Sequence, residues 1–215
     1  MNYCRGELTL LDAASGVDAL RALAQESCAL DVYTLQLSRV SLLSLSTQRH
    51  KGLLQALPKF SALTTLRASA CELSAVQVAG LLDAACALTG LQDLTLSGNA
   101  GVTDGVMQAT SASMPSVRFV ALMRTPLTDA ALPHLARIFG NVAGLHLAQT
   151  VVQGHGLREL IASNSALREL GLDGTRLSEE GVGEIYAAVV ERSEALEVRM
   201  RGVGTQSTAW LPLLE

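Results

Sequence analysis

One apolar pattern recurs six times along this chain of 215 residues. In each copy, branched or apolar residues stand at spacings of three, two and then three, as in Leu91, Leu94, Leu96 and Asn99. The copies lie about 25 to 31 residues apart and begin at Val32, Leu63, Leu91, Val117, Val142 and Leu167. Weaker copies at Leu8 and Val198 extend the series to about eight units. A repeat of this length cannot bury its apolar face alone, so the pattern predicts a stacked solenoid.

A second signal follows each copy, where an apolar residue precedes a polar one. The pairs are Leu73-Ser74, Val102-Thr103, Leu127-Thr128, Val152-Gln153 and Leu177-Ser178. Ser and Thr side chains accept hydrogen bonds from the free N–H groups of a helix start, so the pairs predict that a helix begins after each one. Acidic residues just behind them favour the positive end of a helix. These acids are Asp104, Asp129, Glu179 and Glu180.

These two signals resemble those of leucine-rich repeat proteins of the ribonuclease-inhibitor-like and cysteine-containing subclasses. The resemblance covers about Leu30 to Val203, and it is carried by the apolar columns together with Val-Thr-Asp-Gly-Val at 102–106. It implies an α/β solenoid, horseshoe-shaped, with a parallel concave β-sheet and convex helices. We expect a single domain, in which residues 1–29 form an N-terminal unit or cap, 30–203 the regular repeats and 204–215 a C-terminal cap.

The asparagine column of the repeat is kept strictly only at Asn99. Small polar side chains replace it at Cys71, Thr125, Thr150 and Thr175. We interpret Cys71 as a structural residue whose side chain satisfies backbone groups at the turn. The four cysteines show no disulfide framework or zinc-ligand spacing, so we expect reduced thiols.

Composition and motif searches exclude several function classes. The net charge of −4 argues against general binding to nucleic acid or to anionic membranes. No secretory or organellar signal is recognisable at the amino terminus, so a cytoplasmic location is the default expectation. The four histidines are scattered, without a nucleophile or orienting acid in any known order, and are His50, His134, His146 and His155. We therefore predict a protein that is not an enzyme and needs no cofactor, metal or small-molecule substrate.

Residues between the buried columns should face the open side of the sheet, since successive side chains of a strand point to opposite faces. Seven of the fourteen arginines fall on strands or strand edges, and arginine is favoured at protein interfaces. The candidate partner-binding residues are Arg67, Asp93, Arg118, Phe119, Met123, Arg124, His146, Arg168, Arg199 and Arg201. Phe119 is either the centre of a binding site or a single exposed aromatic residue. The last three arginines either bind a partner or balance the acids Glu169, Asp173 and Glu197.

The resemblance implies a non-catalytic protein-interaction module, an adaptor or structural subunit that binds a protein partner within a larger complex. The alternatives are a regulator of an enzyme, such as an inhibitor or GTPase-activating protein, and a substrate-recognition subunit of a ubiquitin ligase. Residues 41–60 contain the only two lysines and Pro58, which predicts an irregular basic connection, either solvated or a contact site. The apolar segment 209–215 is either a cap on the last repeat or a docking site for another subunit.

Overall fold

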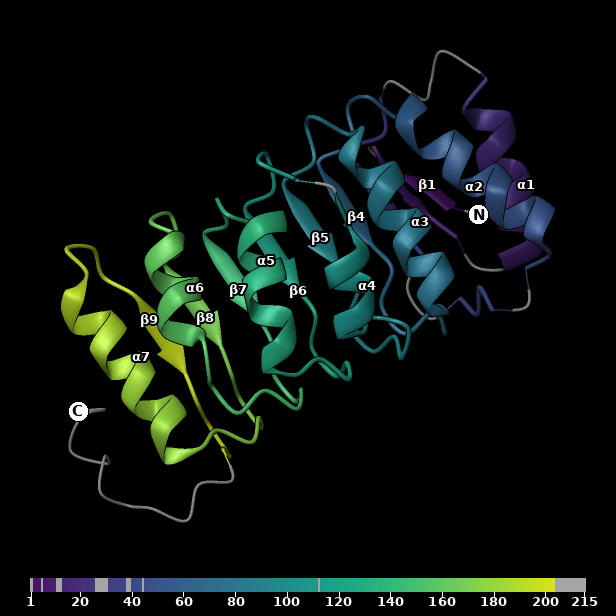
Figure 1. Ribbon diagram of the computed structural model, residues 1–215. Helices are drawn as coiled ribbons and strands as arrows, with labels where there is room; N and C mark the ends of the chain where they lie inside the picture. Colours follow the sequence, from purple (N-terminus) through teal and green to yellow (C-terminus); the bar gives the residue numbers. More distant parts are fainter. Residues whose placement is uncertain are drawn as a thin grey trace.

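The computed structural model describes residues 2–4, 6–10, 13–25, 31–37, 40–43, 45–111 and 113–203. Strands and helices alternate along the chain, and the helices lie together on one side of the sheet (Figure 1). The strands are β1 (Asn2–Cys4), β2 (Glu7–Thr9), β3 (Thr34–Gln36), β4 (Thr65–Arg67), β5 (Asp93–Thr95), β6 (Phe119–Ala121), β7 (Gly144–His146), β8 (Glu169–Gly171) and β9 (Glu197–Arg199). The helices are α1 (Ala13–Leu23), α2 (Thr47–Ala56), α3 (Ala75–Cys86), α4 (Asp104–Ala109), α5 (Leu132–Ile138), α6 (Leu157–Ser163) and α7 (Glu179–Glu191). Two short 3₁₀ helices are η2 (Leu57–Lys59) and η3 (Asp129–Ala131).

The strands form one sheet in sequence order, and β2 to β9 are all parallel. Equivalent residues pair from strand to strand, so that Leu35 lies opposite Leu66 and Leu66 opposite Leu94. This is the leucine-rich repeat solenoid that the sequence predicted. The repeat pattern missed one strand, β1, which pairs antiparallel with β2 around Gly6 at a φ of 84°.

The predicted apolar columns make the core. The central residue of each strand from β2 to β8 is buried, as are the residues two positions later, such as Leu37, Ala68 and Leu96. Residues of the helices, including Val78, Leu135 and Ile185, pack against them from one side. The other side of the sheet is therefore left open to solvent.

Four of the five predicted helix starts are confirmed. Ser74, Thr103, Thr128 and Ser178 each accept a backbone N–H bond at the start of a helix. The prediction at Gln153 is wrong, because α6 begins only at Leu157, after Gly156 in the left-handed conformation.

The turn before α6 is bonded to the preceding repeat. The carboxylate of Asp129 accepts hydrogen bonds from the N–H groups of Gln153, Gly154 and His155, at 2.9, 3.0 and 3.2 Å. An acid of the preceding repeat therefore satisfies the backbone N–H groups ahead of this helix. Asp104 similarly accepts bonds from the backbone N–H and hydroxyl of Thr128. These acids tie each repeat to the next, in addition to facing the start of their own helix.

Asn99 is fully buried and bonds to two repeats at once. Its Oδ1 accepts from the N–H groups of Cys71 and Leu73, and its Nδ2 donates to the carbonyls of Ala68 and Leu96. The Cys71 thiol donates to the Leu37 carbonyl at 2.8 Å, which confirms its structural interpretation.

The threonines of the same column make a smaller contribution. In each one the side-chain hydroxyl donates to a carbonyl three residues earlier, at 2.6 to 2.7 Å. These residues are Thr125, Thr150 and Thr175. The amide of Asn99 and the thiol of Cys71 reach a neighbouring repeat, whereas these threonine hydroxyls bond within their own repeat.

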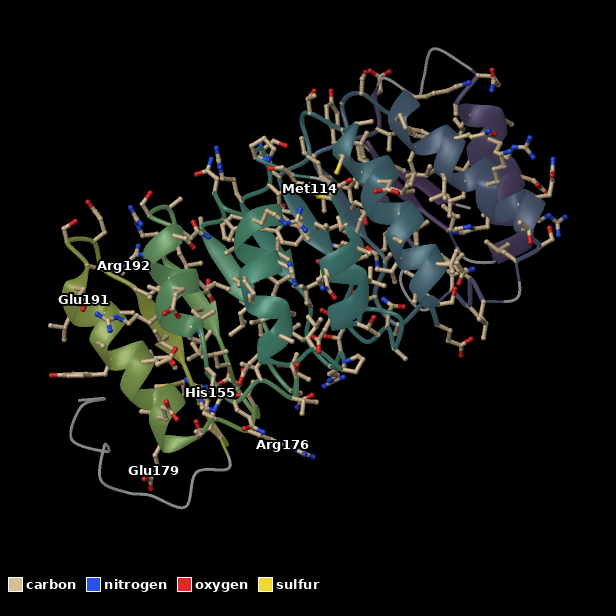
Figure 2. The ribbon with its side chains drawn as sticks, in the orientation of Figure 1. Met114, His155, Arg176, Glu179, Glu191 and Arg192 are labelled. Atoms are coloured by element: carbon tan, nitrogen blue, oxygen red, sulfur yellow. The ribbon has the colours of Figure 1, made fainter. Side chains whose placement is uncertain are left out.

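Arginines at the ends of outer helices cap the helix before them. Arg192, just after α7, donates from its two terminal nitrogens to four carbonyls (Figure 2). The acceptors lie at the end of α6 and in the turn that leads to β8, in Ile161, Asn164, Ser165 and Leu167. Arg137 of α5 likewise donates to the carbonyls of Met107 and Thr110, at the end of α4.

The segment at 41–60 is more regular than predicted. It contains α2, capped by Ser46, and Pro58 stands in the 3₁₀ helix that ends it, where a missing N–H is tolerated. Arg49 lies exposed on α2 and pairs with Asp18 of α1 at 3.0 Å. No helix in the described part of the chain is long and apolar enough to cross a membrane. The predicted C-terminal cap, 204–215, lies outside the described residues.

Candidate functional site

The open face of the sheet carries a shallow hollow of about 220 Å³ over β4 to β7. Its side chains come from two columns of the strands, which the pairing register aligns from repeat to repeat. We call four of them the sheet-face patch, namely Arg67, Asp93, Phe119 and His146. All four were predicted partner-binding residues, and the fold brings them together from four successive repeats.

Two glycines on neighbouring strands leave room for the aromatic rings of the patch. A side chain at Gly144 would meet the ring of Phe119 at 2.7 Å, and one at Gly171 would meet the imidazole of His146 at 3.3 Å. Each ring therefore lies over the glycine of the next strand. The Phe119 side chain nevertheless remains 48% exposed, which is a large apolar exposure on a sheet. Exposed aromatic side chains flanked by polar ones are typical of protein-binding sites.

The charges of the patch are largely free to meet a partner. The exposed guanidinium of Arg67 makes no ion pair with any of the described residues. Asp93 accepts a bond from the Thr65 hydroxyl at 3.3 Å. His146 lies 3.5 Å from the Glu169 carboxylate, measured from Nε2 to Oε1. The patch thus offers a cation and an anion on the β4–β5 side of an exposed aromatic ring, and an imidazole on its β7 side.

A second hollow, of about 440 Å³, adjoins the carboxyl ends of the same strands. Met123 and Arg124, both predicted site residues, line it together with Ser97 and Gln149. Arg124 has a φ of 55°, and its Nε donates to Gln149 Oε1 at 2.6 Å. The sequence did not single out Gln149, although its place in the turn equivalent to that of Arg124 is a signal for it.

The remaining predicted residues lie apart from the patch or are paired within the chain. Arg118 donates to the carbonyls of Pro115 and Asn141. Arg168 pairs with Glu194 at 3.5 Å. The backbone of Arg201 donates to Asp173.

Arg199 is the most strongly paired of the predicted arginines. Its Nε donates to Glu197 at 2.8 Å, and its NH1 lies 3.0 Å from Glu169. The bond to Glu197, and then the charge of Glu169, raise the pKa of this guanidinium above its ordinary value. The ion pairs of Arg199 with Glu169 and Glu197 favour, for that residue, the alternative in which the last arginines balance the acids beside them, whereas Arg168 pairs with a different acid, Glu194.

Among the described side chains, the histidines and cysteines are not arranged as a catalytic group. Burial lowers the pKa of His50 on α2, and burial together with Asp83 raises the pKa of the Cys86 thiol on α3. A raised pKa keeps this thiol protonated and less nucleophilic. His134 lies on α5 and His155 in the turn before α6. The open face of the sheet is thus suited to binding and has no arrangement suited to bond breaking among the described side chains.

No family model and no curated protein matches this chain. Among solved structures it is similar to the tropomodulin C-terminal domain of Caenorhabditis elegans, with 15% identity and a TM-score of 0.44, over 81% of this chain and 91% of that one. An internalin from Listeria monocytogenes matches with 16% identity and a TM-score of 0.46, over 86% of this chain and 59% of that one. A protein from Bacteroides fragilis gives 10% identity, a TM-score of 0.40, and coverage of 93% and 75%. The fold assignment rests on the strand register of the chain itself.

Proposed function

We propose that this chain is a protein-interaction module, an adaptor or structural subunit, that binds a protein partner on the open face of its sheet. Phe119 carries the proposal, because it is a half-exposed aromatic side chain in a hollow of the sheet face. It lies between the imidazole of His146 and the guanidinium of Arg67, which forms no ion pair with any described residue. Burying such a ring against a partner removes apolar surface from water, and Arg67 and Arg124 can pair with the partner's carboxylates.

Within the predicted site, we expect the middle repeats to contact the partner rather than the last ones. The units around β4 to β7 carry the contact, since their charges are available, whereas Arg168 and Arg199 are engaged by Glu194, Glu169 and Glu197. An enzyme regulator or a ubiquitin-ligase receptor would use the same surface. Activity assays on the captured partner separate those alternatives from a structural subunit.

Affinity capture with two matched variants tests the surface. The first variant combines Phe119→Ala with Arg124→Glu and is expected to weaken capture of the partner at least tenfold, since it removes the aromatic contact and reverses a charge. The control combines Tyr186→Ala with Arg176→Glu. Tyr186 is 51% exposed on α7, so the control removes a similar exposed ring from the helix layer.

Both variants should keep the melting temperature of the wild-type chain within about 2 °C, because they change exposed side chains. Equal capture by the first variant and the wild type would contradict the proposed surface. Loss of capture by the control variant alone would indicate that the partner binds the helix layer and not the sheet face.

A further inference from the structure

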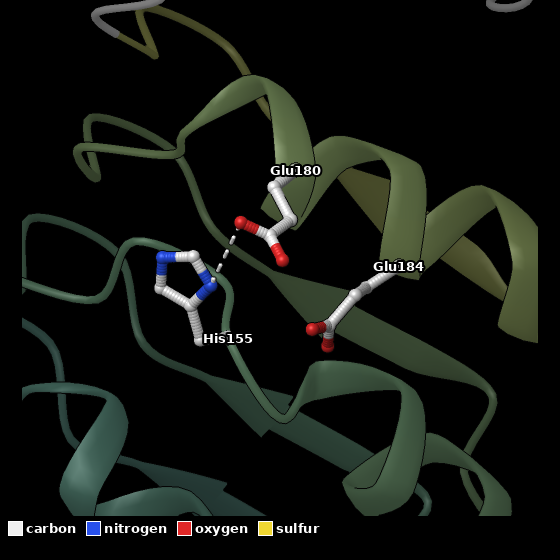
Figure 3. Close-up of side chains that lie close together, drawn as sticks. All are labelled: His155, Glu180 and Glu184. Atoms are coloured by element: carbon white, nitrogen blue, oxygen red, sulfur yellow. Dashed lines mark ion pairs between the residues drawn. The ribbon is translucent and has the colours of Figure 1, made fainter.

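A second cluster lies at the edge of the helix layer and is separate from the sheet-face patch (Figure 3). It consists of His155, in the turn before α6, and of Glu180 and Glu184, one turn apart on α7. One potential ligand atom from each residue lies within 4.8 Å of the other two. The imidazole points to Glu180, with Nδ1 3.7 Å from Oε2.

Backbone hydrogen bonds hold two of these residues in place. The Oε2 atom of Glu184 accepts from the N–H groups of Gly156 and Arg158, at 2.8 and 3.3 Å. The N–H of His155 donates to Asp129 at 3.2 Å. The turn that carries the imidazole is thus anchored from both neighbouring repeats. Among the described residues, the second oxygen of Glu184 makes no hydrogen bond and remains open to a ligand.

Backbone N–H groups at the start of α6, and not cationic side chains of the described part of the chain, face the carboxylate of Glu184. Among the described residues, neither Glu180 nor Glu184 forms an ion pair with an arginine or a lysine. The nearby Arg158 pairs instead with Glu191. Two carboxylates therefore face one imidazole, an arrangement that favours a cation.

We propose that His155, Glu180 and Glu184 bind a divalent transition-metal ion of the zinc type. The imidazole indicates which class of metal ion would bind, because zinc accepts nitrogen and oxygen ligands, whereas magnesium and calcium prefer oxygen alone. Tetrahedral zinc at about 2.0 to 2.1 Å from its ligands requires them to lie about 3.3 Å apart. The exposed side chains of His155 and Glu180 would rotate toward Glu184 to reach this spacing, and water would complete the coordination. The ion would join the turn before α6 to α7 and so brace two repeats.

Calorimetric titration of the full chain with zinc alone tests this site. The wild type is expected to bind one ion per chain at this cluster, and His155→Ala should weaken that binding at least tenfold because it removes the nitrogen ligand. Glu180→Gln should weaken it as well. The matched control is His134→Ala, which removes a half-buried histidine of α5 outside the cluster and should leave the affinity unchanged.

Zinc should also raise the melting temperature of the wild type and of the His134 variant, but not that of the His155 variant, because a ligand that binds only the folded state stabilises it. Three results would overturn the site: no zinc binding by the wild type, equal affinity in the wild type and His155→Ala, or equal affinity of the wild type for magnesium and zinc. The sheet-face patch is untouched by these variants, so partner capture is a separate result.

Discussion

Replacing Asn99 with alanine is expected to lower the free energy of unfolding by about 4 kcal/mol. The change leaves buried N–H groups of Cys71 and Leu73 and buried carbonyls of Ala68 and Leu96 without their partner. A loss of this size is a large part of the total stability of a typical domain. Urea-induced unfolding followed by circular dichroism measures it.

The loss of unfolding free energy in Asn99→Ala can be compared with the losses in two further variants. Thr125→Val removes one hydrogen bond, to the carbonyl of Leu122, and should cost about 1 kcal/mol. Asn99→Thr should fall between the two, because a hydroxyl can bond to the local carbonyl but does not reach the neighbouring repeat. If Asn99→Ala costs no more than Thr125→Val, the side-chain amide does not join the repeats as described.

The second large effect is expected for Arg192→Met, at about 2 to 3 kcal/mol. Methionine preserves much of the apolar stem, but it leaves four carbonyls around the end of α6 without their charged donor. Hydrogen bonds to a charged group are stronger than those between neutral groups. Thermal and urea-induced unfolding of the variant measure the loss.

Arg158→Met is the matched control for Arg192. Arg158 forms an ion pair with Glu191, but both side chains are about half exposed, at 49% and 54%. Surface ion pairs of this kind contribute about 0 to 1 kcal/mol. Arg192, which forms no ion pair with a described residue, should therefore contribute more to stability than Arg158, which does. A larger loss for Arg158→Met than for Arg192→Met would show that the cap at α6 is not important for stability.

The sequence predicted the strands and their register because the apolar columns have no other place to be buried. Leu35, Leu66 and Leu94 stand at the same position of each repeat, and only one alignment of the strands buries all of them. The positions of the residues in the sheet-face patch could be predicted from that register, since Phe119 and His146 lie on neighbouring strands in fixed columns. Residue alternation alone was enough to place these side chains on the open face.

Features that depend on loop geometry could not be predicted in this way. Nothing in the local sequence showed that Asp129 would bind three N–H groups of the next repeat, or that α6 would begin only at Leu157. The capping role of Arg192 and the meeting of His155 with Glu180 likewise join residues 25 or more positions apart. Such contacts depend on how two irregular segments stack, which has no simple periodic signal.

The antiparallel strand β1 was missed for a different reason. It is a short hairpin partner of β2 and does not carry the repeat pattern, so a search for that pattern passes over it. The residues between Cys4 and Glu7 include Gly6, and a glycine in a two-residue connection is a hairpin signal. Strand β1 pairs with the outer edge of β2, which the parallel repeats would otherwise leave unpaired.

Site-specific photo-crosslinking tests most directly the claim that a partner binds the open face of the sheet. A photoreactive residue is placed at Thr95, on β5 within the patch hollow, or at Gln108, exposed on α4 of the same repeat. The two positions share one repeat and differ in the layer that they occupy, so the comparison controls for folding and expression. A crosslinked partner is expected from position 95 and none from position 108. A crosslink from position 108 without one from position 95 would contradict that claim.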